Sequence, residues 1–355
     1  MTKIALITDQ HFGARNDSQL FLDYYEQFYS EVFFPKLLEE NVKCLLILGD
    51  TFDRRKYINF NSLQRAKKMF FDKLEEYAID TYMLVGNHDT YYKNTNEVNS
   101  VRILIDDNDY IHIIDKPQTI TPVSGHKFCM IPWICADNYQ DCIKEISNTD
   151  ASFCCGHFEI QGFASWRGVI SHEGLSRDLF RKFEYTFSGH YHHKSNSDGI
   201  YYLGNPYELT WMDYQDQRGF HIFDVDSRDL VFHQNPFVMF HRFVYNDNDE
   251  EYSNIDVDYL KNKYVKVVVV SKNSPYTFDR FMDKIYSVEP ADVSIVEDFT
   301  DLTEGLDDDM VNQAEDTLTI LNKTVDSINE NGIDNIKLKN ILRELYVEAS
   351  NLGVV

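Results

Sequence analysis

Residues 44–53 read CLLILGDTFD, a short apolar run that turns abruptly into Gly49-Asp50. The same pattern recurs at residues 3–9 (KIALITD), 81–87 (TYMLVGN), 152–157 (SFCCGH) and 185–190 (YTFSGH). Short apolar runs of this kind, bounded by turn residues, predict buried strands. Apolar residues at helical spacing predict helices over residues 20–38 and 63–77, between the first three runs. The alternation of strand and helix predicts an α/β fold with a largely parallel core sheet.

The rest of the chain divides into further segments. Strands over residues 199–203 and 219–224 are closely spaced, so we expect them to be antiparallel. An acidic, turn-rich stretch, NDNDEEYSN at 246–254, predicts a domain boundary. Beyond it, a strand over 264–271, a helix over 277–288 and a strand over 291–296 predict a small βαβ unit. We therefore expect three parts, at residues 1–243, 244–300 and 301–355.

Composition narrows the class of protein. The 355 residues are 43% hydrophobic and 14% aromatic, which is enough apolar surface to exclude global disorder. No run of about 18 apolar residues and no signal-peptide pattern is present, so we expect a cytoplasmic protein with no membrane span. The six cysteines are scattered without CxxC spacing and are expected to be reduced. A net charge of −24 argues against nucleic-acid binding unless bound cations or a basic partner offset it.

Polar residues of a few types follow all five runs. They are Asp9 and His11; Asp50 and Asp53; Asn87, His88 and Asp89; His157; and His190 and His192. One histidine at a strand end is most often structural, but five such ends favour a shared site, because ligands of open α/β sheets bind beyond the carboxyl ends of strands. Oxygen and imidazole ligands without a thiolate suit Mn²⁺, Fe²⁺ or Zn²⁺. The set exceeds one coordination sphere, so we predict two ions about 4 Å apart that hold a phosphoryl group and a water.

The order of these motifs resembles the calcineurin-like metallophosphoesterases. Within that family it is similar to the SbcD-type nucleases, including the recombination endonuclease subunits of T-even-like bacteriophages. The resemblance is carried by DxH at 9–11, GDTFDRRK at 49–56, GNHD at 86–89, IPW at 131–133, ASFCCGHFE at 151–159, GHxH at 189–192 and RGF at 218–220. It implies a two-sheet α/β/β/α sandwich with a small βαβ capping module and a C-terminal helical tail.

The resemblance also implies a role for each matched residue. One ion is expected on Asp9, His11, Asp50 and His192, and the other on Asp50, Asn87, His157 and His190, with Asp50 bridging. His88 matches the family's catalytic histidine, which does not bind metal and either donates a proton to the leaving oxygen or stabilises the transition state. The role of Asp89 stays open between orienting His88 and capping a turn. His193 is expected to be a solvated neighbour of the site.

Basic and aromatic residues beside the motifs have less certain roles. Arg54, Arg55, Lys56 and Lys93 are either phosphate contacts or solvated loop residues. Tyr91 and Tyr92 are either packing residues or contacts for DNA, and Trp133 is expected to pack. A heptad-type apolar stripe predicts one helix in the tail, and a second helix is predicted over 335–351. The stripe packs against the first domain, against a second copy of the chain or against a partner protein. Its residues are Val311, Ala314, Leu318, Leu321, Val325 and Ile328.

The resemblance implies an Mn²⁺-dependent DNA nuclease subunit of an SbcC/SbcD-type recombination and repair complex. The expected activities are a 3′–5′ exonuclease on duplex ends and an endonuclease on single strands. The expected partners are DNA, a second copy of the chain and an SMC-type ATPase that docks on the C-terminal helices, in the host cytoplasm if the protein is phage-encoded. The alternatives are a phosphatase for a small phosphoester or a phosphoprotein, and a DNA-end tethering scaffold with a vestigial metal site.

Overall fold

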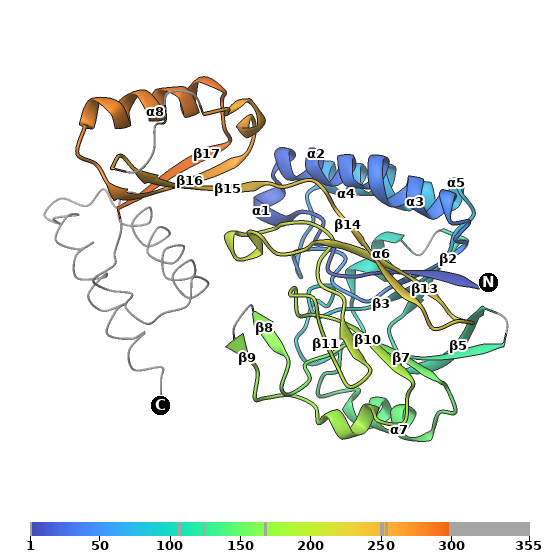
Figure 1. Ribbon diagram of the computed structural model, residues 1–355. Coiled ribbons are helices and arrows are strands. Elements are labelled where there is room, and N and C mark those ends of the chain that lie inside the picture. The colour runs from blue at the N-terminus through green and yellow to red at the C-terminus, as the bar shows by residue number, and fades with distance from the viewer. Residues whose placement is uncertain are drawn as a thin grey trace, which may run out of the picture.

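The computed structural model describes residues 2–297, apart from residues 106–107, 124, 167–168, 249–251 and 253–254. These residues form two six-stranded sheets and a separate three-stranded sheet (Figure 1). The expected helical tail at 301–355 lies outside the described residues. Within the described part of the chain, no helix has both the length and the apolar character that a membrane span requires.

The first large sheet has the order β14-β13-β1-β2-β3-β4. Four neighbouring strands are parallel: β1 (Lys3–Ile7), β2 (Cys44–Ile47), β3 (Asp80–Leu84) and β4 (Ile111–Ile114). On the other side of β1, β13 (Gly219–Asp224) is antiparallel to β1, and β14 (Leu230–Gln234) is antiparallel to β13. Its helices are α1 (Ala14–Asp17), α2 (Gln19–Phe28), α3 (Phe34–Glu39), α4 (Phe60–Ala66), α5 (Asp72–Glu76) and α6 (Ser100–Ile105). Single π-helical turns at Tyr29–Phe33 and Lys67–Phe71 join α2 to α3 and α4 to α5, so both long predicted helices are present with a bulge in each.

The second large sheet has the order β11-β12-β10-β7-β6-β5. Its strands are β5 (Gln118–Val123), β6 (His126–Ile131), β7 (Phe153–His157), β10 (Tyr185–Gly189), β11 (Ser195–Ser197) and β12 (Ile200–Tyr202). A short hairpin, β8 (Ala164–Trp166) with β9 (Val169–Ile170), lies between β7 and β10 in the chain, and α7 (Tyr139–Asn148) between β6 and β7. The strand expected at 199–203, β12, was predicted to be antiparallel. It is antiparallel to β11 but parallel to β10, because the chain has already reversed direction once at β11. The 219–224 strand is antiparallel to β1, as predicted.

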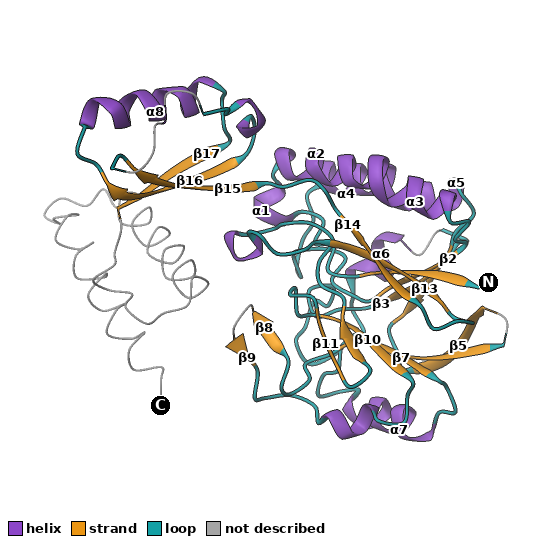
Figure 2. Ribbon diagram, viewed as in Figure 1, coloured by secondary structure: helices purple, strands orange, loops and turns teal. Residues whose placement is uncertain are grey.

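The two large sheets pack face to face. One apolar cluster joins Leu6 and Leu46 of the first sheet to Phe128, Phe153 and Phe187 of the second. Figure 2 shows α2 to α5 on the outer side of the first sheet and α7 on the outer side of the second. This arrangement confirms the predicted α/β/β/α sandwich, and it brings the carboxyl ends of strands from both sheets to one rim.

The small sheet consists of three parallel strands with one helix against them. They are β15 (Phe240–Asn246), β16 (Tyr264–Ser271) and β17 (Asp292–Glu297), with α8 (Pro275–Ser287) packed on one face. The side chain of Ser274 accepts a hydrogen bond from the backbone N–H of Thr277 and caps α8, which begins with Pro275. β15 adds a strand to the predicted βαβ unit and begins at Phe240, ahead of the expected boundary at residue 244. The Tyr264 ring lies 5.7 Å from the Phe21 ring of α2, so the module contacts the larger domain.

Candidate metal centre

The candidate site lies where β1, β2, β3, β7 and β10 end. The two sheets meet there, because the backbone N–H of His190, after β10, donates to the carboxylate of Asp9, after β1, at 3.1 Å. β7 and β10 are in register, with His157 opposite Gly189. All the predicted ligands therefore come together at one rim, although they are spread over most of the first 192 residues of the sequence.

The backbone at this rim is unusually tight. Asp9, His11 and Asp50 have positive φ angles of 52°, 46° and 52°, a conformation that is uncommon for residues other than glycine. A Cβ on Gly86 would lie 2.2 Å from the backbone nitrogen of Asp50, and a Cβ on Gly189 would lie 2.0 Å from the Thr8 hydroxyl oxygen. The glycines that precede Asn87 and His190 are thus required for the loops to approach one another.

Four predicted ligands form a first group: Asp9, His11, Asp50 and His192. The Nε2 atoms of His11 and His192 are 3.2 Å apart. His11 Nε2 lies 4.0 Å from Asp9 Oδ1 and 3.8 Å from Asp50 Oδ2. His192 Nε2 lies 3.9 Å from Asp9 Oδ1. The ligand atoms of Asp9, His11 and His192 lie within 4.8 Å of one another, a spacing that a single bound cation allows, and Asp50 adjoins them through His11.

The remaining predicted ligands form a second group: Asp50, Asn87, His157 and His190. His157 Nε2 lies 3.2 Å from Asp50 Oδ2 and 2.9 Å from Asn87 Oδ1. His190 Nδ1 lies 3.0 Å from the same Asn87 oxygen. Asp50 Oδ2 faces His11 on one side and His157 on the other, so Asp50 stands between the two groups.

Burial sets the electrostatics of these groups. Asp9 and His157 are fully buried and Asp50 is 2% exposed. Burial lowers the pKa of both His11 and His157. For His11 this effect is outweighed by the hydrogen bond to Asp53, which raises the pKa to about 9. For His157 it is outweighed by the charge of Asp50, which also raises the pKa to about 9. Burial holds the pKa of His192 well below its usual value, which leaves this imidazole neutral with a lone pair to share. Buried carboxylates, an amide oxygen and imidazole nitrogens without a thiolate fit divalent ions such as Mn²⁺ or Zn²⁺.

His88 adjoins the ligands without being inside either group. Its backbone N–H donates to Asp50 Oδ1 at 2.7 Å, and its Nδ1 donates to the backbone carbonyl of Asp53 at 2.7 Å. Its ring lies 4.9 Å from the His11 ring. With Nδ1 engaged in this way, Nε2 is the nitrogen available to a substrate. Ligand-type atoms of His11, Asp53 and His88 also lie within 4.8 Å of one another, so the assignment of His88 as a proton donor stays a prediction.

The structure resolves the role of Asp89. Its buried carboxylate accepts hydrogen bonds from the backbone N–H groups of Thr51, Phe52 and Gly86, at 3.1, 3.1 and 2.9 Å. Burial and the neighbouring charge of Asp50 raise the pKa of Asp89 to about 7. Asp89 therefore joins the two ligand loops to each other. Of the two roles left open by the sequence, this is the capping of a turn. His193 is paired with Asp216 at 2.7 Å.

Three residues that contact the site histidines were not among the predicted ligands. Asp53 Oδ1 lies 3.4 Å from His11 Nδ1, and Glu159 Oε1 lies 3.0 Å from His190 Nε2. The Trp133 ring lies 5.3 Å from the His190 ring and 6.1 Å from the His157 ring, so it packs against the site itself. The motifs GDxxD and GHFE contain both carboxylates, but no spacing rule pairs them with these particular histidines.

Arg218 supports the loop that carries His192. Its guanidinium is 4% exposed and donates to the backbone carbonyl of His192 and to the side-chain oxygen of Asn205. It also pairs with Asp213 and Asp216, each at 2.8 Å. This buried network fixes the position of the GHxH loop relative to the segment after β12.

The four candidate phosphate contacts lie beside the site in different settings. Arg54 pairs with Asp17 at 3.2 Å, and Arg55 donates to the Thr90 hydroxyl at 3.3 Å. Lys56 lies 5.8 Å above the Tyr91 ring and is exposed, as is Lys93. None of the hydrogen bonds or ion pairs of the described residues joins these four cations to a predicted ligand.

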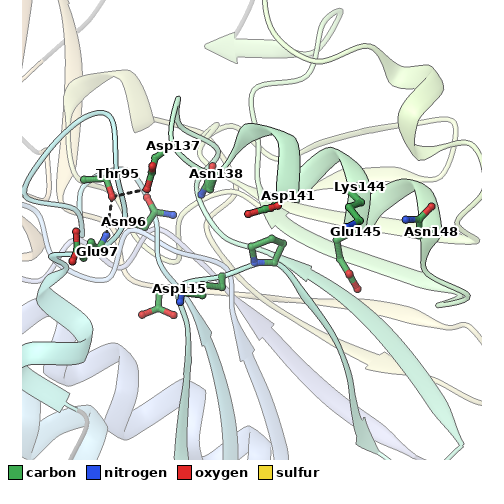
Figure 3. Close-up of a pocket in the computed structure, with 12 residues that line it drawn as sticks. Thr95, Asn96, Glu97, Asp115, Asp137, Asn138, Asp141, Lys144, Glu145 and Asn148 are labelled. Carbon is green, nitrogen blue, oxygen red and sulfur yellow. Dashed lines mark hydrogen bonds between the residues drawn. The ribbon is translucent and has the colours of Figure 1, made fainter.

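A separate cavity of about 710 Å³ lies beyond Trp133. Asn96 and Asn138 in its wall both donate to the Trp133 carbonyl, at 2.8 and 2.9 Å. Figure 3 shows Asp141, Lys144, Glu145 and Asn148 along α7 on one side and Thr95 to Glu97 on the other. Five carboxylates line it, those of Glu97, Asp115, Asp137, Asp141 and Glu145, against two lysines, Lys116 and Lys144. This excess of negative charge disfavours a phosphate ligand there.

Comparisons with known proteins place these features in a family. A family model described as calcineurin-like phosphoesterase matches residues 2–194. Exonuclease subunit 1 of Enterobacteria phage T4 is 29% identical over 304 residues, which are 85% of this chain and 86% of that protein. A novel archaeal phosphodiesterase is 12% identical with a TM-score of 0.33, and the match covers 66% of this chain and 99% of that one. A hypothetical protein from Thermus thermophilus is 11% identical with a TM-score of 0.37, and the match covers 66% and 98%.

The family model spans more than half of the chain, and its range includes the ten polar residues at the five strand ends, Asp53 among them, and Glu159. The resemblance stated from the motifs is therefore confirmed at the level of the family. The chain belongs to the calcineurin-like phosphoesterases, a family of metal-dependent phosphoester hydrolases.

Proposed function

We propose that the protein is the nuclease subunit of an SbcC/SbcD-type recombination and repair complex. It acts as a 3′–5′ exonuclease on duplex ends and as an endonuclease on single strands. The observation that carries this proposal is the pair of ligand groups that share Asp50 Oδ2, at 3.8 Å from His11 and 3.2 Å from His157. A phage protein named exonuclease subunit 1 matches this chain over 85% of its length at 29% identity. This match is our reason to propose DNA as the substrate rather than phosphoesters in general.

Asp9, His11, Asp50 and His192 would hold one ion, and Asp50, Asn87, His157 and His190 would hold the other. Two bound ions supply Lewis acidity and offset the charge that develops on a phosphodiester. Mn²⁺ is the ion that we assign, because the resemblance to the SbcD-type nucleases implies it and ligands of oxygen and imidazole without a thiolate are compatible with it. The buried carboxylates and Trp133 keep the ligand histidines in place and restrict access of bulk water.

His88, when both of its ring nitrogens carry a proton, supplies from Nε2 the proton that the leaving oxygen takes up. The hydrogen bond from its Nδ1 to the Asp53 carbonyl fixes the ring and leaves Nε2 pointing to the substrate side. The backbone N–H of His88 is held by Asp50, so the position of the ring follows the position of the bridging ligand. A phosphodiester bound in the site would thereby be oriented relative to Nε2 of His88.

The parts of the chain divide the work of the complex. Residues 1–243 carry the chemistry, residues 244–300 form a module on the DNA side, and residues 301–355 dock on an SMC-type ATPase. The chain forms a homodimer within a complex of two nuclease and two ATPase subunits. Because the net charge is −24, bound ions, basic surfaces of the partner or both offset the charge of the chain when it binds DNA at physiological salt. A phage-encoded protein of this kind works in the host cytoplasm.

The proposal is tested by comparing two substrates with the purified chain and Mn²⁺. A nuclease releases nucleotides from linear duplex DNA and turns over little p-nitrophenyl phosphate, and Asp50→Ala abolishes the release. A protein that hydrolyses the monoester and leaves DNA intact is a phosphatase. A protein that binds metal and DNA ends but cleaves neither substrate is a tethering scaffold.

The docking assignment has its own experiment. Deletion of residues 305–355 is expected to leave a soluble, metal-binding nuclease that no longer co-purifies with the co-expressed ATPase. If the truncated protein aggregates or loses its metal, the tail belongs to the core and the docking assignment is wrong.

A further inference from the structure

The sheet of the small module has two faces, and α8 covers one of them (Figure 2). Val265, Val267 and Val269 of β16 belong to the apolar cluster beneath α8. Successive side chains of a strand point to opposite faces, so Val268 and Val270 lie on the other face. The three strands are parallel, and parallel sheets are normally covered on both faces. The second face therefore raises the question of what covers it.

A row of valines crosses this second face. Val244 of β15 is in register with Val268 of β16, which is in register with Val296 of β17, and Val270 follows on β16. We call these four residues the valine row. Val268 and Val296 are largely buried, but Val244 is 51% exposed and Val270 is 48% exposed. None of the apolar clusters that the described residues form includes a member of the valine row.

The larger domain covers only the beginning of this face. Tyr264 contacts the Phe21 ring of α2, and Lys266 Nζ lies 4.6 Å from the centre of the Trp211 ring. Tyr264 and Lys266 are the first residues of β16 on the face that carries Val268 and Val270 further along the strand. The valine row thus continues a face that is already used for packing.

A cation without a partner lies beside the valine row. Arg242 is two residues before Val244 and therefore on the same face of β15. No ion pair among the described residues includes Arg242, and its Nε is buried without an acceptor. Buried N–H groups of this kind normally donate to an oxygen. Arg242 therefore indicates that a group with acceptor oxygens completes this face together with an apolar surface.

The C-terminal segment of this chain has both properties. The described residues end at Glu297, the last residue of β17 and the neighbour of Val296. Residues 298–309 contain six acidic residues and no basic one, and the predicted apolar stripe begins at Val311. The 13 residues from 298 to 310 can span about 40 Å, whereas neighbouring strands are about 5 Å apart. The stripe can therefore return to the valine row, and the short tether gives it a high effective concentration there.

We infer that the predicted helix with the apolar stripe folds back onto the valine row when the chain is without its partner. The stripe covers the valines, and acidic residues of 298–309 face Arg242. A second copy that met this face by symmetry would bring two Arg242 side chains together, whereas the tail brings carboxylates. The inference goes beyond the proposed function, because it concerns the free chain. If docking on the ATPase uses the same stripe, as proposed above, the ATPase displaces it from the sheet.

The test measures hydrogen–deuterium exchange of the full-length chain by mass spectrometry. Val244→Asp and Val270→Asp each place a charge in the valine row, and exchange in residues 311–328 is expected to become about tenfold faster in both. Arg242→Gln removes only the cation and is expected to have a smaller effect in the same direction. Val231→Asp changes a valine of equal exposure (50%) in β14 and serves as the matched control. Exchange in residues 265–269 reports whether the module itself stays folded.

Three results would overturn the inference. The first is exchange in residues 311–328 that is equal in Val270→Asp, Val231→Asp and the unaltered protein. The second is exchange of the stripe in the unaltered protein at the rate of an unstructured peptide. The third is protection that falls on dilution, which would mean that a second copy covers the face. If Val244→Asp and Val270→Asp unfold the module, Arg242→Gln decides, because it changes no apolar contact. DNA cleavage with Mn²⁺ tests the proposed function separately, and its absence would leave this inference standing.

Discussion

The carboxylate of Glu159 lies 3.0 Å from Nε2 of His190, the ring nitrogen opposite the one that faces Asn87. The hydrogen bond with His190 lowers the pKa of Glu159, so the carboxylate is ionised and accepts from the imidazole. An acceptor on the outer nitrogen fixes the tautomer of a ligand histidine and raises its basicity. Glu159 is therefore a positioning residue for one ligand of the proposed metal centre.

Removal of this acceptor is expected to weaken metal binding. Glu159→Ala should lower the Mn²⁺ affinity of one site by about 10- to 100-fold, the usual effect of losing such a partner. Glu159→Gln keeps an oxygen acceptor and should lose less of the Mn²⁺ affinity. Titration calorimetry with Mn²⁺ measures both variants. Glu184→Ala is the control, because Glu184 pairs with Arg228 and no histidine. Equal affinities in Glu159→Ala and Glu184→Ala would show that the His190 contact has no effect on metal binding.

The position of Asp50 between the two ligand groups gives a second prediction. Asp50→Ala should reduce the metal content from two ions per chain to less than one, because a bridging carboxylate serves both sites. Elemental analysis after gel filtration in Mn²⁺ gives the stoichiometry. Asp150→Ala, which removes an exposed carboxylate paired with Lys127, should keep two ions. A variant at Asp50 that still binds one ion tightly would show that Asp50 is a ligand of a single site.

Much of this site was predictable from the sequence, because a strand that ends in a polar cluster identifies both the strand and the rim to which it points. Asp9, Asp50 and His157 could be grouped in this way although 148 residues separate the first from the last. The pairing of Glu159 with His190 could not, since it depends on the orientation of one side chain relative to a neighbouring strand. Trp133 gave no chemical signal, because a tryptophan in a ligand shell and one in a core have the same local sequence pattern.

The strand directions show a similar limit. Close spacing in sequence favours an antiparallel hairpin, but Ile200–Tyr202 pairs parallel to β10 because β11 is inserted first. A strand as short as Ser195–Ser197 has too little apolar character to be recognised from periodicity. The strand β15 was missed for a related reason: its exit runs into the acidic stretch at 246–254, which resembles a linker.

His88 and His192 should respond differently to substitution. His88→Asn removes the proposed proton donor and should lower the rate of DNA cleavage by about 10²- to 10⁴-fold with two ions still bound. His192→Ala removes an atom that lies 3.2 Å from His11 Nε2, so it should lower metal content as well as rate. Mn²⁺ stoichiometry and exonuclease rate are measured on the same preparations. Loss of an ion in His88→Asn would make His88 a ligand, and unchanged cleavage would make it a bystander.

Stability in acid should depend on a buried histidine that is not a predicted metal ligand. His221 in β13 is 5% exposed, and its ring lies 5.0 Å from the Phe232 ring. Burial lowers the pKa of His221 from 6.5 to about 3, so the folded protein keeps this side chain neutral while the unfolded chain protonates it below pH 6.5. The stability that the neutral form contributes is complete above pH 6.5 and is lost as the pH falls toward 3. At pH 5 the loss is about 2 kcal/mol.

The expected result is a change in the slope of the unfolding free energy against pH, measured by urea unfolding between pH 5 and pH 7. His221→Leu cannot take up a proton, so the difference in unfolding free energy between this variant and the unaltered protein should shift in favour of the variant by about 2 kcal/mol at pH 5. The difference is the quantity to compare, because the ligand histidines titrate in both proteins and cancel. His172→Leu, at an exposed position, should leave the slope unchanged. Parallel pH profiles for His221→Leu and the unaltered protein would mean that His221 takes up its proton without unfolding.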